Sequence, residues 1–572
     1  MRRRNLKVSS NCPPESGGQR DRIAITRGVV PTKKRFGLVV TLLLVFAVPA
    51  VAQSPKGALA TLIENGDRKA ALERIRTAST ADINEPQPDG TRPIQWAIHN
   101  VDYEILGALI AKKATLNFRN DFGSTPIAQA AELGDARMVK MLLDAGAEPE
   151  GANADGQTAL MVAIKTGETA AVDLLIKAGA NVNTIEKFHK QTPLMWAVSA
   201  PRNAGAITKL LLSKGADFKP RATFTDWPSQ ITAEPRAQYR PTGGLTALLY
   251  AARDGCSDCA GALISAGADV NFPTPDGVTA LMLALDNDHN DTAKLLLARG
   301  ANPRLWDWWG RTALYIAIDR KETLDGTRRK GGTQPAAPVV SSMEIINALL
   351  SANVEINAQL AMERPSRSGN SGRFIDPQLN VGCTPLMRAT IGDRSAKVET
   401  WMIGGDPEVV RALLAKGANP NINSASLTPF LVAAGVGPGF VTGATGLAMD
   451  SSVGGPVNKE VMELLLQNGA DINAQVTGTK TYSMRISRAP SANEGRTALH
   501  MATLEGKTDM VRYLLSKGAS TEVKDAGGMK PIDLLPGGAQ GTSAPPLPAA
   551  GAVTPAVAAE IRGLLQTAAS RK

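Results

Sequence analysis

Apolar and polar positions along the chain repeat in blocks of 33 residues, and each block has the spacing of two short helices. Each block opens with a Thr, followed by Pro or Ala and then by an apolar residue, as in Thr125-Pro126-Ile127. Blocks at this spacing begin at Thr125 and Thr158, and again at Thr246, Thr279 and Thr312. A Thr side chain caps a helix, and Pro is tolerated at the first helical position because its missing N–H would have no partner there. Each Thr therefore predicts the start of a first helix.

A second marker, Gly-Ala, follows the Thr after 21 residues and ends a second apolar segment. In one block Val139, Leu142 and Leu143 have the spacing of one helix face, and Gly146 follows them. Glycine ends a helix readily because it adopts the left-handed conformation, and Asn353, the next-best residue type, takes its place in one block. An Asp-Gly turn then precedes the next Thr. Each block thus predicts a turn and two helices.

The period, the cap and the Gly-Ala stop together resemble the ankyrin repeat, whose first helix opens with Thr-Pro-Leu-His-x-Ala. The most similar segment is Thr497-Ala498-Leu499-His500-Met501-Ala502, and the other blocks lack the histidine. The resemblance implies an all-α fold, an ankyrin-repeat solenoid of about twelve helix-turn-helix units with β-turn fingers over residues 57–572. It also implies a scaffold that binds another protein, without saying which one.

Insertions interrupt the regular spacing at seven places. The interval from Thr192 to Thr246 is 54 residues instead of 33, and the extra residues follow the Gly-Ala marker. We expect insertions in the fingers near 218–243, 358–382 and 474–495, and between the paired helices near 319–342, 391–406 and 435–458. A Pro/Ala/Gly-rich stretch near 536–556 divides the last unit, and a capping helix is expected over 558–568. Gly- and Pro-rich composition predicts loops, among them residues 325–338.

The first 52 residues resemble an export signal. Three basic residues, 33–35, precede an apolar run over 36–48, and Ala50-Val51-Ala52 fits a cleavage site before Gln53. We predict a bacterial-type signal peptide over 1–52, a short linker over 53–56 and a periplasmic or secreted protein. The basic region before the apolar run is long for a signal peptide. Two alternatives therefore stay open: a translation start near Val29 or Val30, and an uncleaved inner-membrane anchor formed by residues 36–52.

Composition and charge narrow the function classes. A hydrophobic fraction of 43% is too high for a disordered chain. The whole chain has 63 Lys/Arg and 53 Asp/Glu, but ten of the basic and two of the acidic residues lie in residues 1–52. The remaining chain holds 53 basic and 51 acidic groups. This near-neutral balance lacks the excess positive charge that binding to nucleic-acid phosphates requires. We expect a monomer that binds a protein partner, binds no nucleic acid, and meets a membrane only through an uncleaved signal segment.

The sequence contains no recognisable catalytic or metal-binding motif. None of its four histidines belongs to a His-Glu-x-x-His pattern or a metal-ligand cluster, and no Gly-x-Ser-x-Gly or Walker-type loop occurs. The many glycines coincide with helix ends and turns. We therefore expect no catalytic residues, no metal and no cofactor, and predict that the protein is not an enzyme.

Cys256 and Cys259 form the one pair whose spacing could carry chemistry. The Cys-x-x-Cys spacing suits a redox or metal pair, but no second pair completes a zinc site and Ala260 replaces the His of a c-type haem motif. Cys259 falls on the apolar face of the second helix, which favours burial or a local disulfide in an oxidising compartment. A thiol-redox component using the two cysteines remains the alternative. Cys383 is expected to stay unpaired.

Aromatic residues are only 4% of the chain, so their clusters stand out. Trp and Tyr on exposed loops are enriched among the residues that dominate protein interfaces. Packing of the rings on one another is the competing interpretation. The clustered aromatic residues lie in two successive fingers: Phe224, Trp227 and Tyr239 in the first, and Trp306, Trp308 and Trp309 in the second. The resulting hypothesis is an exported scaffold that binds a protein through its fingers and first helices; the alternatives are a membrane-anchored organiser and the redox component.

Overall fold

The computed structural model describes residues 58–153, 155–225, 242–328, 340–361, 382–391, 405–424, 426–437, 457–478, 491–536 and 553–571. Within these ranges the chain forms twelve successive helix pairs, the last of which begins with a 3-10 helix. The proposed signal peptide 1–52 and linker 53–56 lie outside the described residues, as do Trp227 and Tyr239. Across the described ranges, no helix combines the length and the apolar character needed to span a bilayer.

The helices of each pair form two rows. The first helices are α1 (Leu59–Glu64), α4 (Pro93–His99), α6 (Pro126–Glu132), α8 (Ala159–Thr166), α10 (Pro193–Val198), α12 (Ala247–Asp254), α14 (Ala280–Asp286), α16 (Ala313–Arg328), α18 (Pro385–Ile391), α20 (Pro429–Ala433), α22 (Ala498–Leu504) and the 3-10 helix η2 (Pro531–Leu534). The second helices are α2 (Arg68–Thr77), α5 (Tyr103–Ala111), α7 (Ala136–Asp144), α9 (Thr169–Lys177), α11 (Ala204–Ser213), α13 (Ser257–Ser265), α15 (Asn290–Ala298), α17 (Ser342–Ser351), α19 (Pro407–Ala415), α21 (Lys459–Gln467), α23 (Thr508–Ser516) and α24 (Pro555–Ser570). The short helix α3 (Thr80–Ile83) lies between the first two pairs.

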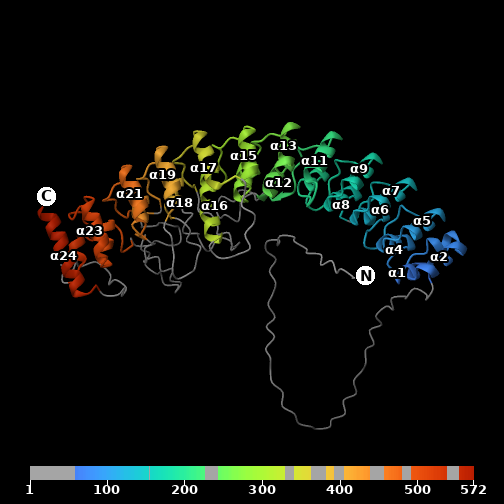
Figure 1. Ribbon diagram of the computed structural model, residues 1–572, viewed down its shortest axis with the longest axis horizontal. Coiled ribbons are helices and arrows are strands. Elements are labelled where there is room, and N and C mark those ends of the chain that lie inside the picture. The colour runs from blue at the N-terminus through green and yellow to red at the C-terminus, as the bar shows by residue number, and fades with distance from the viewer. Residues whose placement is uncertain are drawn as a thin grey trace, which may run out of the picture.

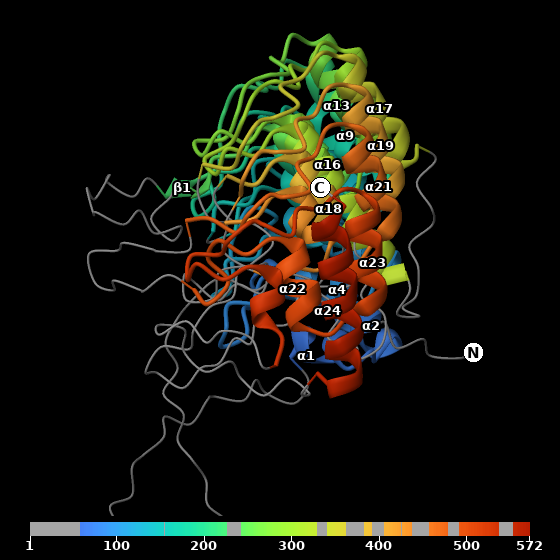
Figure 2. The same cartoon turned by 90° about the vertical axis from the view of Figure 1, so that its left-hand side faces the viewer.

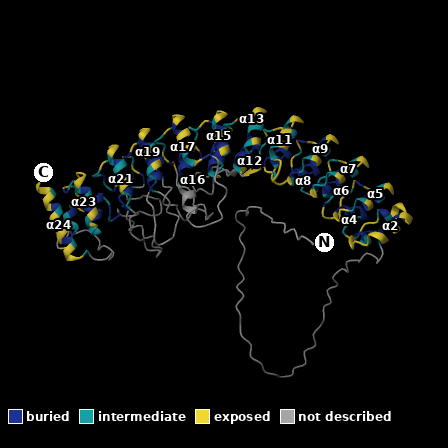
Figure 3. Cartoon of the chain, in the orientation of Figure 1, coloured by how far each residue is buried: buried dark blue, intermediate teal, exposed yellow. Residues whose placement is uncertain are grey.

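The pairs stack into a long arch, with the first helices along its inner side and the second helices along its outer side (Figure 1). Each helix packs against its partner and against helices of the adjoining units. One continuous apolar core runs between the two rows, from Leu59 to Leu565. Buried residues accordingly lie between the rows, and exposed residues mark the outer edge (Figure 3). The prediction of an all-α ankyrin-repeat solenoid of about twelve units is confirmed.

Threonine caps start the first helices, as the sequence predicted. In the nine units that open with Thr, its hydroxyl accepts the backbone N–H three residues later at 3.1–3.4 Å. Of the three first helices that lack this Thr, α1 has no side-chain cap, and α4 and η2 use a different bond. Gln95 accepts the N–H of Arg92 at 3.2 Å, and Asp533 accepts that of Lys530 at 2.9 Å.

The glycines of the Gly-Ala marker have the left-handed backbone that the sequence required of them. Gly146 has φ +91° and Gly300 has φ +88°. Asn353 holds the same place with φ +52°, which confirms that asparagine substitutes for glycine in that unit.

Asparagine side chains link successive units, a feature that the sequence analysis did not identify. The amide of Asn183 donates to the carbonyl oxygen of Gly215 at 3.1 Å and accepts the N–H of Asp217 at 2.7 Å. The same pair of bonds recurs at Asn117, Asn271 and Asn421. Each such Asn satisfies a helix-terminal carbonyl of the next unit, which would otherwise lack a partner.

Regular secondary structure occurs at the start of the predicted insertions near 218–243 and near 319–342. The finger insertion near 218–243 is closed at its base by two short antiparallel strands, β1 (Phe224–Thr225) and β2 (Thr242–Gly243), which pair Phe224 with Gly243. The insertion near 319–342 was expected to be a loop, but α16 continues to Arg328. Two ion pairs lie at the start of this extension and hold it in place: Arg320 with Asp288, and Lys321 with Asp406.

Candidate protein-binding surface

Backbone hydrogen bonds join the fingers into a row beside the helices. Each bond runs from one finger to the next: Lys187 N to Asp155 O at 3.1 Å, Thr223 N to His189 O at 2.7 Å, Trp308 N to Asp276 O at 2.9 Å, and Ala361 N to Trp309 O at 2.8 Å. In the end-on view the fingers project to one side of the stacked helices, where β1 is labelled (Figure 2). The fingers are therefore held in fixed order along one edge of the arch.

Exposed apolar side chains concentrate on these fingers. Among the described residues, nine large apolar side chains are exposed, and seven of them lie in fingers. We call these seven residues the finger ridge: Phe122, Ile185, Phe188, Phe224, Phe272, Trp306 and Trp308. Exposed apolar groups that gather in one region mark interaction sites more often than scattered ones do. The finger ridge is thus the described surface best suited to a protein partner.

The structure divides the aromatic residues that the sequence singled out. The side chains of Trp306 and Phe224 are 69% and 47% exposed, and that of Trp308 is 41% exposed. Trp309 is only 4% exposed, with the guanidinium of Arg311 5.3 Å from its ring centre. The Trp309 ring is therefore buried within its finger, unlike the exposed rings of Trp306 and Trp308. Trp227 and Tyr239 lie outside the described residues.

A buried ion-pair cluster fixes the finger that carries Trp306 and Trp308. The Arg311 Nε lies 2.7 Å from Asp307 Oδ2, and its Nη2 lies 3.0 Å from Asp286 Oδ2 on α14. The other oxygen of Asp307 accepts the backbone N–H groups of Trp309 and Arg311 at 3.1 and 2.9 Å. Burial alone would lower the pKa of Arg311, but the two carboxylates outweigh it and raise that pKa. The guanidinium stays charged, and the finger is preorganised.

The inner helices add half-buried apolar side chains at one repeated position, four residues after the capping position. Trp96, Val162, Trp196 and Leu283 occupy it in four of the units. The indole N–H of Trp96 donates to Gln87 Oε1 at 2.7 Å, which ties the first helix to its finger. The indole N–H of Trp196 is buried and has no hydrogen-bond partner in the described part of the chain.

Four finger-ridge residues were missed in the sequence, among them Ile185 and Phe272, and the two most exposed of the four are Phe122 and Phe188. Their side chains are 74% and 65% exposed. A signal was present for Phe122, because it stands directly before Gly123 in an Asp-Phe-Gly turn, where a buried aromatic ring would be hard to place. Phe188 lies among Lys187, His189 and Lys190, a polar setting that also favours exposure.

A disulfide joins Cys256 and Cys259 at the start of α13, with the two Cα atoms 5.2 Å apart. Cys259 is fully buried, whereas Cys256 is half-buried. Cys383 is buried beside Tyr315, whose hydroxyl lies 3.8 Å from the sulfur. Burial raises the pKa of the Cys383 thiol to about 12, so this thiol is unreactive in the folded protein.

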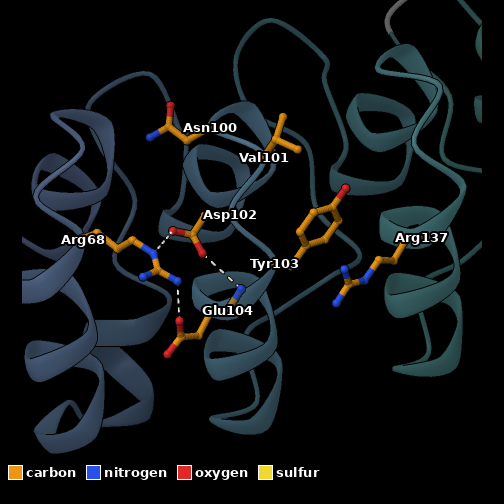
Figure 4. A pocket seen from close by; sticks show the side chains of 7 residues that line it. All are labelled: Arg68, Asn100, Val101, Asp102, Tyr103, Glu104 and Arg137. Atoms are coloured by element: carbon orange, nitrogen blue, oxygen red, sulfur yellow. Dashed lines mark hydrogen bonds and ion pairs between the residues drawn. The ribbon is translucent and has the colours of Figure 1, made fainter. Parts of the chain in front are cut away.

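A shallow pocket of about 440 Å³ lies between α2, α5 and α7, at the interhelix turns of the first units (Figure 4). Arg68 Nε lies 2.7 Å from Asp102 Oδ2, and a second ion pair joins Arg68 to Glu104. Burial raises the pKa of Asp102, but the N–H of Ile105 and the Arg68 guanidinium outweigh it, and the net shift is downward. Tyr103 donates to Asp135 at 2.6 Å. The charges of Arg68, Asp102 and Glu104 are already paired with one another. These residues therefore link neighbouring units and do not present an unpaired acid or base for catalysis.

Across the described ranges, no three His, Cys, Asp or Glu side chains gather in a way that could hold a metal ion. His500 makes polar contacts through both of its ring nitrogens. Its Nδ1 accepts the N–H of Thr497 at 3.2 Å, and its Nε2 lies 3.0 Å from the carbonyl oxygen of Met529. Because that carbonyl only accepts, Nε2 carries the proton. His500 therefore connects its first helix to the next finger.

Comparison with known proteins identifies the repeat. A family model of ankyrin repeats, three copies long, matches residues 57–153, 129–222, 232–307, 248–325 and 400–525, which together are more than half of the chain. Among solved structures, the human ASB11 ankyrin repeat domain matches with 22% sequence identity and a TM-score of 0.34, covering 44% of this chain and 100% of that one. No curated protein gives a significant match. On the strength of the family model, the chain belongs to the ankyrin-repeat family.

Proposed function

We propose that this protein is an exported ankyrin-repeat scaffold that binds a protein partner through its fingers and first helices. Ankyrin repeats imply a protein–protein interaction scaffold. The observation that carries the finer proposal is the finger ridge, because seven of the nine exposed large apolar side chains in the described residues lie on it. Phe and Trp side chains supply large apolar contact area, and Trp is among the residue types enriched in binding hot spots.

Rigidity of the fingers supports this function. The backbone bonds between successive fingers and the buried Asp307–Arg311 pair hold the exposed rings before any partner arrives. Binding to a preordered surface loses little conformational entropy, which leaves more of the contact energy for affinity. The half-buried Trp96 and Trp196 on the inner helices would extend the contact from the fingers toward the helices.

Crosslinking in the native compartment, followed by mass spectrometry, tests the binding surface. We compare the wild-type chain with a variant carrying Phe188→Ser, Phe224→Ser, Trp306→Ser and Trp308→Ser. Loss of hot-spot rings should reduce partner recovery by about tenfold or more. The matched control is Leu133→Ser, an exposed apolar residue outside the fingers, which is 46% exposed and should leave recovery unchanged. Equal recovery with the quadruple variant, folded by circular dichroism, would disprove the binding surface.

Export is the second part of the proposal and has its own measurement. The basic, apolar and Ala-x-Ala segments within residues 1–52 support a cleaved signal peptide and a periplasmic or secreted protein. N-terminal sequencing of the natural protein should then begin at Gln53. If the chain instead begins upstream of Phe36 and stays with carbonate-washed membranes, residues 36–52 act as an inner-membrane anchor and the scaffold is a membrane-bound organiser.

A further inference from the structure

The Cys256–Cys259 disulfide occupies a position that aspartate fills in other units. Cys256 is the N-terminal cap of α13, a helix of nine residues. At the same place, Asp102 caps α5, Asp135 caps α7 and Asp406 caps α19, each accepting backbone N–H groups through its carboxylate. In α13 the sulfur of Cys256 takes this role, and the N–H of Cys259 lies 3.3 Å from it. The sulfur therefore sits where three other units place a capping carboxylate.

That position places the Cys256 sulfur against backbone N–H groups at the start of the helix. The free N–H groups at a helix N-terminus carry partial positive charge, which stabilises a negatively charged sulfur placed there. A sulfur that is stable as a thiolate is also a good leaving group when a mixed disulfide is resolved. The N-cap position thus favours the release of Cys256 from a mixed disulfide with a partner.

The two sulfurs differ in their access to solvent. Cys259 is 0% exposed and belongs to the continuous apolar core, whereas Cys256 is half-buried at the turn between α12 and α13. A thiolate that approaches from solvent reaches the residue at the turn and not the one in the core. This asymmetry assigns different roles to the two cysteines.

We propose that Cys256 and Cys259 form a thiol–disulfide exchange site, with Cys256 as the sulfur attacked from solvent and Cys259 as the buried leaving sulfur. The co-reactant is a dithiol protein of the thiol oxidoreductase class. The site lies at an interhelix turn, whereas the finger ridge lies in the turns between units, so the exchange is a function beyond the scaffold. It does not depend on the identity of the scaffold's partner.

The exchange proceeds in two balanced steps. The partner's first thiolate attacks Cys256 Sγ, a bond forms between these two sulfurs, and the Cys256–Cys259 bond breaks with its electron pair left on Cys259 Sγ, which takes up a proton. The partner's second thiolate then attacks the partner sulfur of the mixed disulfide and releases Cys256 as a thiolate. The partner dithiol loses two electrons and becomes a disulfide, while this chain gains them as two reduced cysteines.

The first experiment asks whether the bond exchanges in the folded protein. The full-length protein is incubated with dithiothreitol without denaturant, quenched with iodoacetamide and analysed by peptide mass spectrometry. We expect Cys256 to be alkylated, the buried Cys259 and Cys383 to be labelled only after denaturation, and the circular dichroism spectrum to be unchanged. A disulfide that only braces the turn would resist dithiothreitol until denaturant is added, and that result would overturn the proposal.

The second experiment separates the two roles. The variants Cys259→Ser and Cys256→Ser are reduced, freed of reductant and exposed to glutathione disulfide under native conditions. Cys256 in the first variant should form the glutathione mixed disulfide at least about tenfold faster than Cys259 does in the second. Cys383, present in both, serves as the buried control. Equal rates, or a faster Cys259, would contradict the assignment of Cys256 as the attacked sulfur.

Discussion

At the scale of single residues, Val101 is the exception in the interhelix turns. It has φ +54°, whereas the corresponding left-handed residue in the other described turns is glycine, asparagine or aspartate, as at Gly66, Asn203 and Asp288. A left-handed backbone costs roughly 1–2 kcal/mol for a residue with a Cβ, and a β-branched side chain tolerates it worst. Val101 is also 43% exposed, so its side chain contributes less by burial than a core valine does.

Replacing Val101 should therefore stabilise the protein. We expect Val101→Asn to raise the free energy of unfolding by about 0.5–1 kcal/mol, because asparagine tolerates the left-handed conformation. The reciprocal control is Gly66→Val, at a position with φ +78° where an added Cβ meets nothing within 4 Å. That change introduces strain without a clash and should lower stability by roughly 1–2 kcal/mol. Urea denaturation followed by circular dichroism measures both; a destabilised Val101→Asn protein would contradict the strain argument.

His500 gives the stability a pH dependence. Burial lowers the pKa of His500 below its ordinary value, although the carbonyl of Met529 acts in the opposite direction. The unfolded imidazole titrates at a pKa of about 6.5. Between the folded and unfolded values the unfolded chain binds more protons, so the free energy of unfolding falls as the pH drops below about 6.5, by at most about 1.4 kcal/mol per pH unit.

The variant His500→Gln isolates this contribution. Its free energy of unfolding should decline less than that of the wild type between pH 7.5 and pH 5.5, because the glutamine side chain takes up no proton in that range. Urea titrations at the two pH values measure the difference. Parallel declines in both proteins would show that His500 is not the group responsible.

At the scale of elements, the threonine cap is the device that repeats most regularly. Thr279 starts α14, is 3% exposed and accepts the N–H of Met282 at 3.3 Å. We expect Thr279→Ala to lower the free energy of unfolding by about 1 kcal/mol, because one helical N–H loses its partner. Thr279→Ser keeps the hydroxyl and should recover most of that loss in the same urea titration. If Ser and Ala destabilise equally, the lost methyl packing and not the cap explains the effect.

The helices could be predicted because their signals are local. Thr125 marks the start of a first helix and Gly146 the end of a second helix within one unit. Both roles follow from local backbone geometry, so the sequence alone predicts them. The extension of α16 to Arg328 was not predictable in this way. It is anchored by ion pairs to Asp288 and Asp406, residues that the chain places in two other units.

The candidate surface was only partly predictable for the same reason. Clustering in the sequence identified Trp306, Trp308 and Trp309 together, but exposure is decided by three-dimensional contacts. Trp309 is buried with Arg311 against its ring, while Trp306 remains open. Phe122 and Phe188 belong to separate units, and only the stacking of the fingers places them on the same edge of the arch.

At the scale of the whole molecule, near-neutral charge sets how binding responds to salt. Residues 53–572 carry 53 basic and 51 acidic groups. Without a large net field, partner association has little long-range electrostatic steering. We expect the Kd for the crosslinked partner to change by less than about threefold when ionic strength rises from about 0.05 to about 0.5 M. Titration by isothermal calorimetry measures this, and a tenfold or larger weakening would indicate an interface dominated by charge.

In the described part of the chain, the helices of each unit pack mainly against one another and against the adjoining units, and asparagine bonds repeat that connection along the fingers. Bending of such an array is distributed over many small movements between neighbouring units. A slight rotation between each pair of neighbouring units adds up to a large change in the distance between the two ends of the array, while no single contact is broken. A small change in the curvature of the array would therefore move distant fingers relative to one another, while neighbouring fingers stay joined.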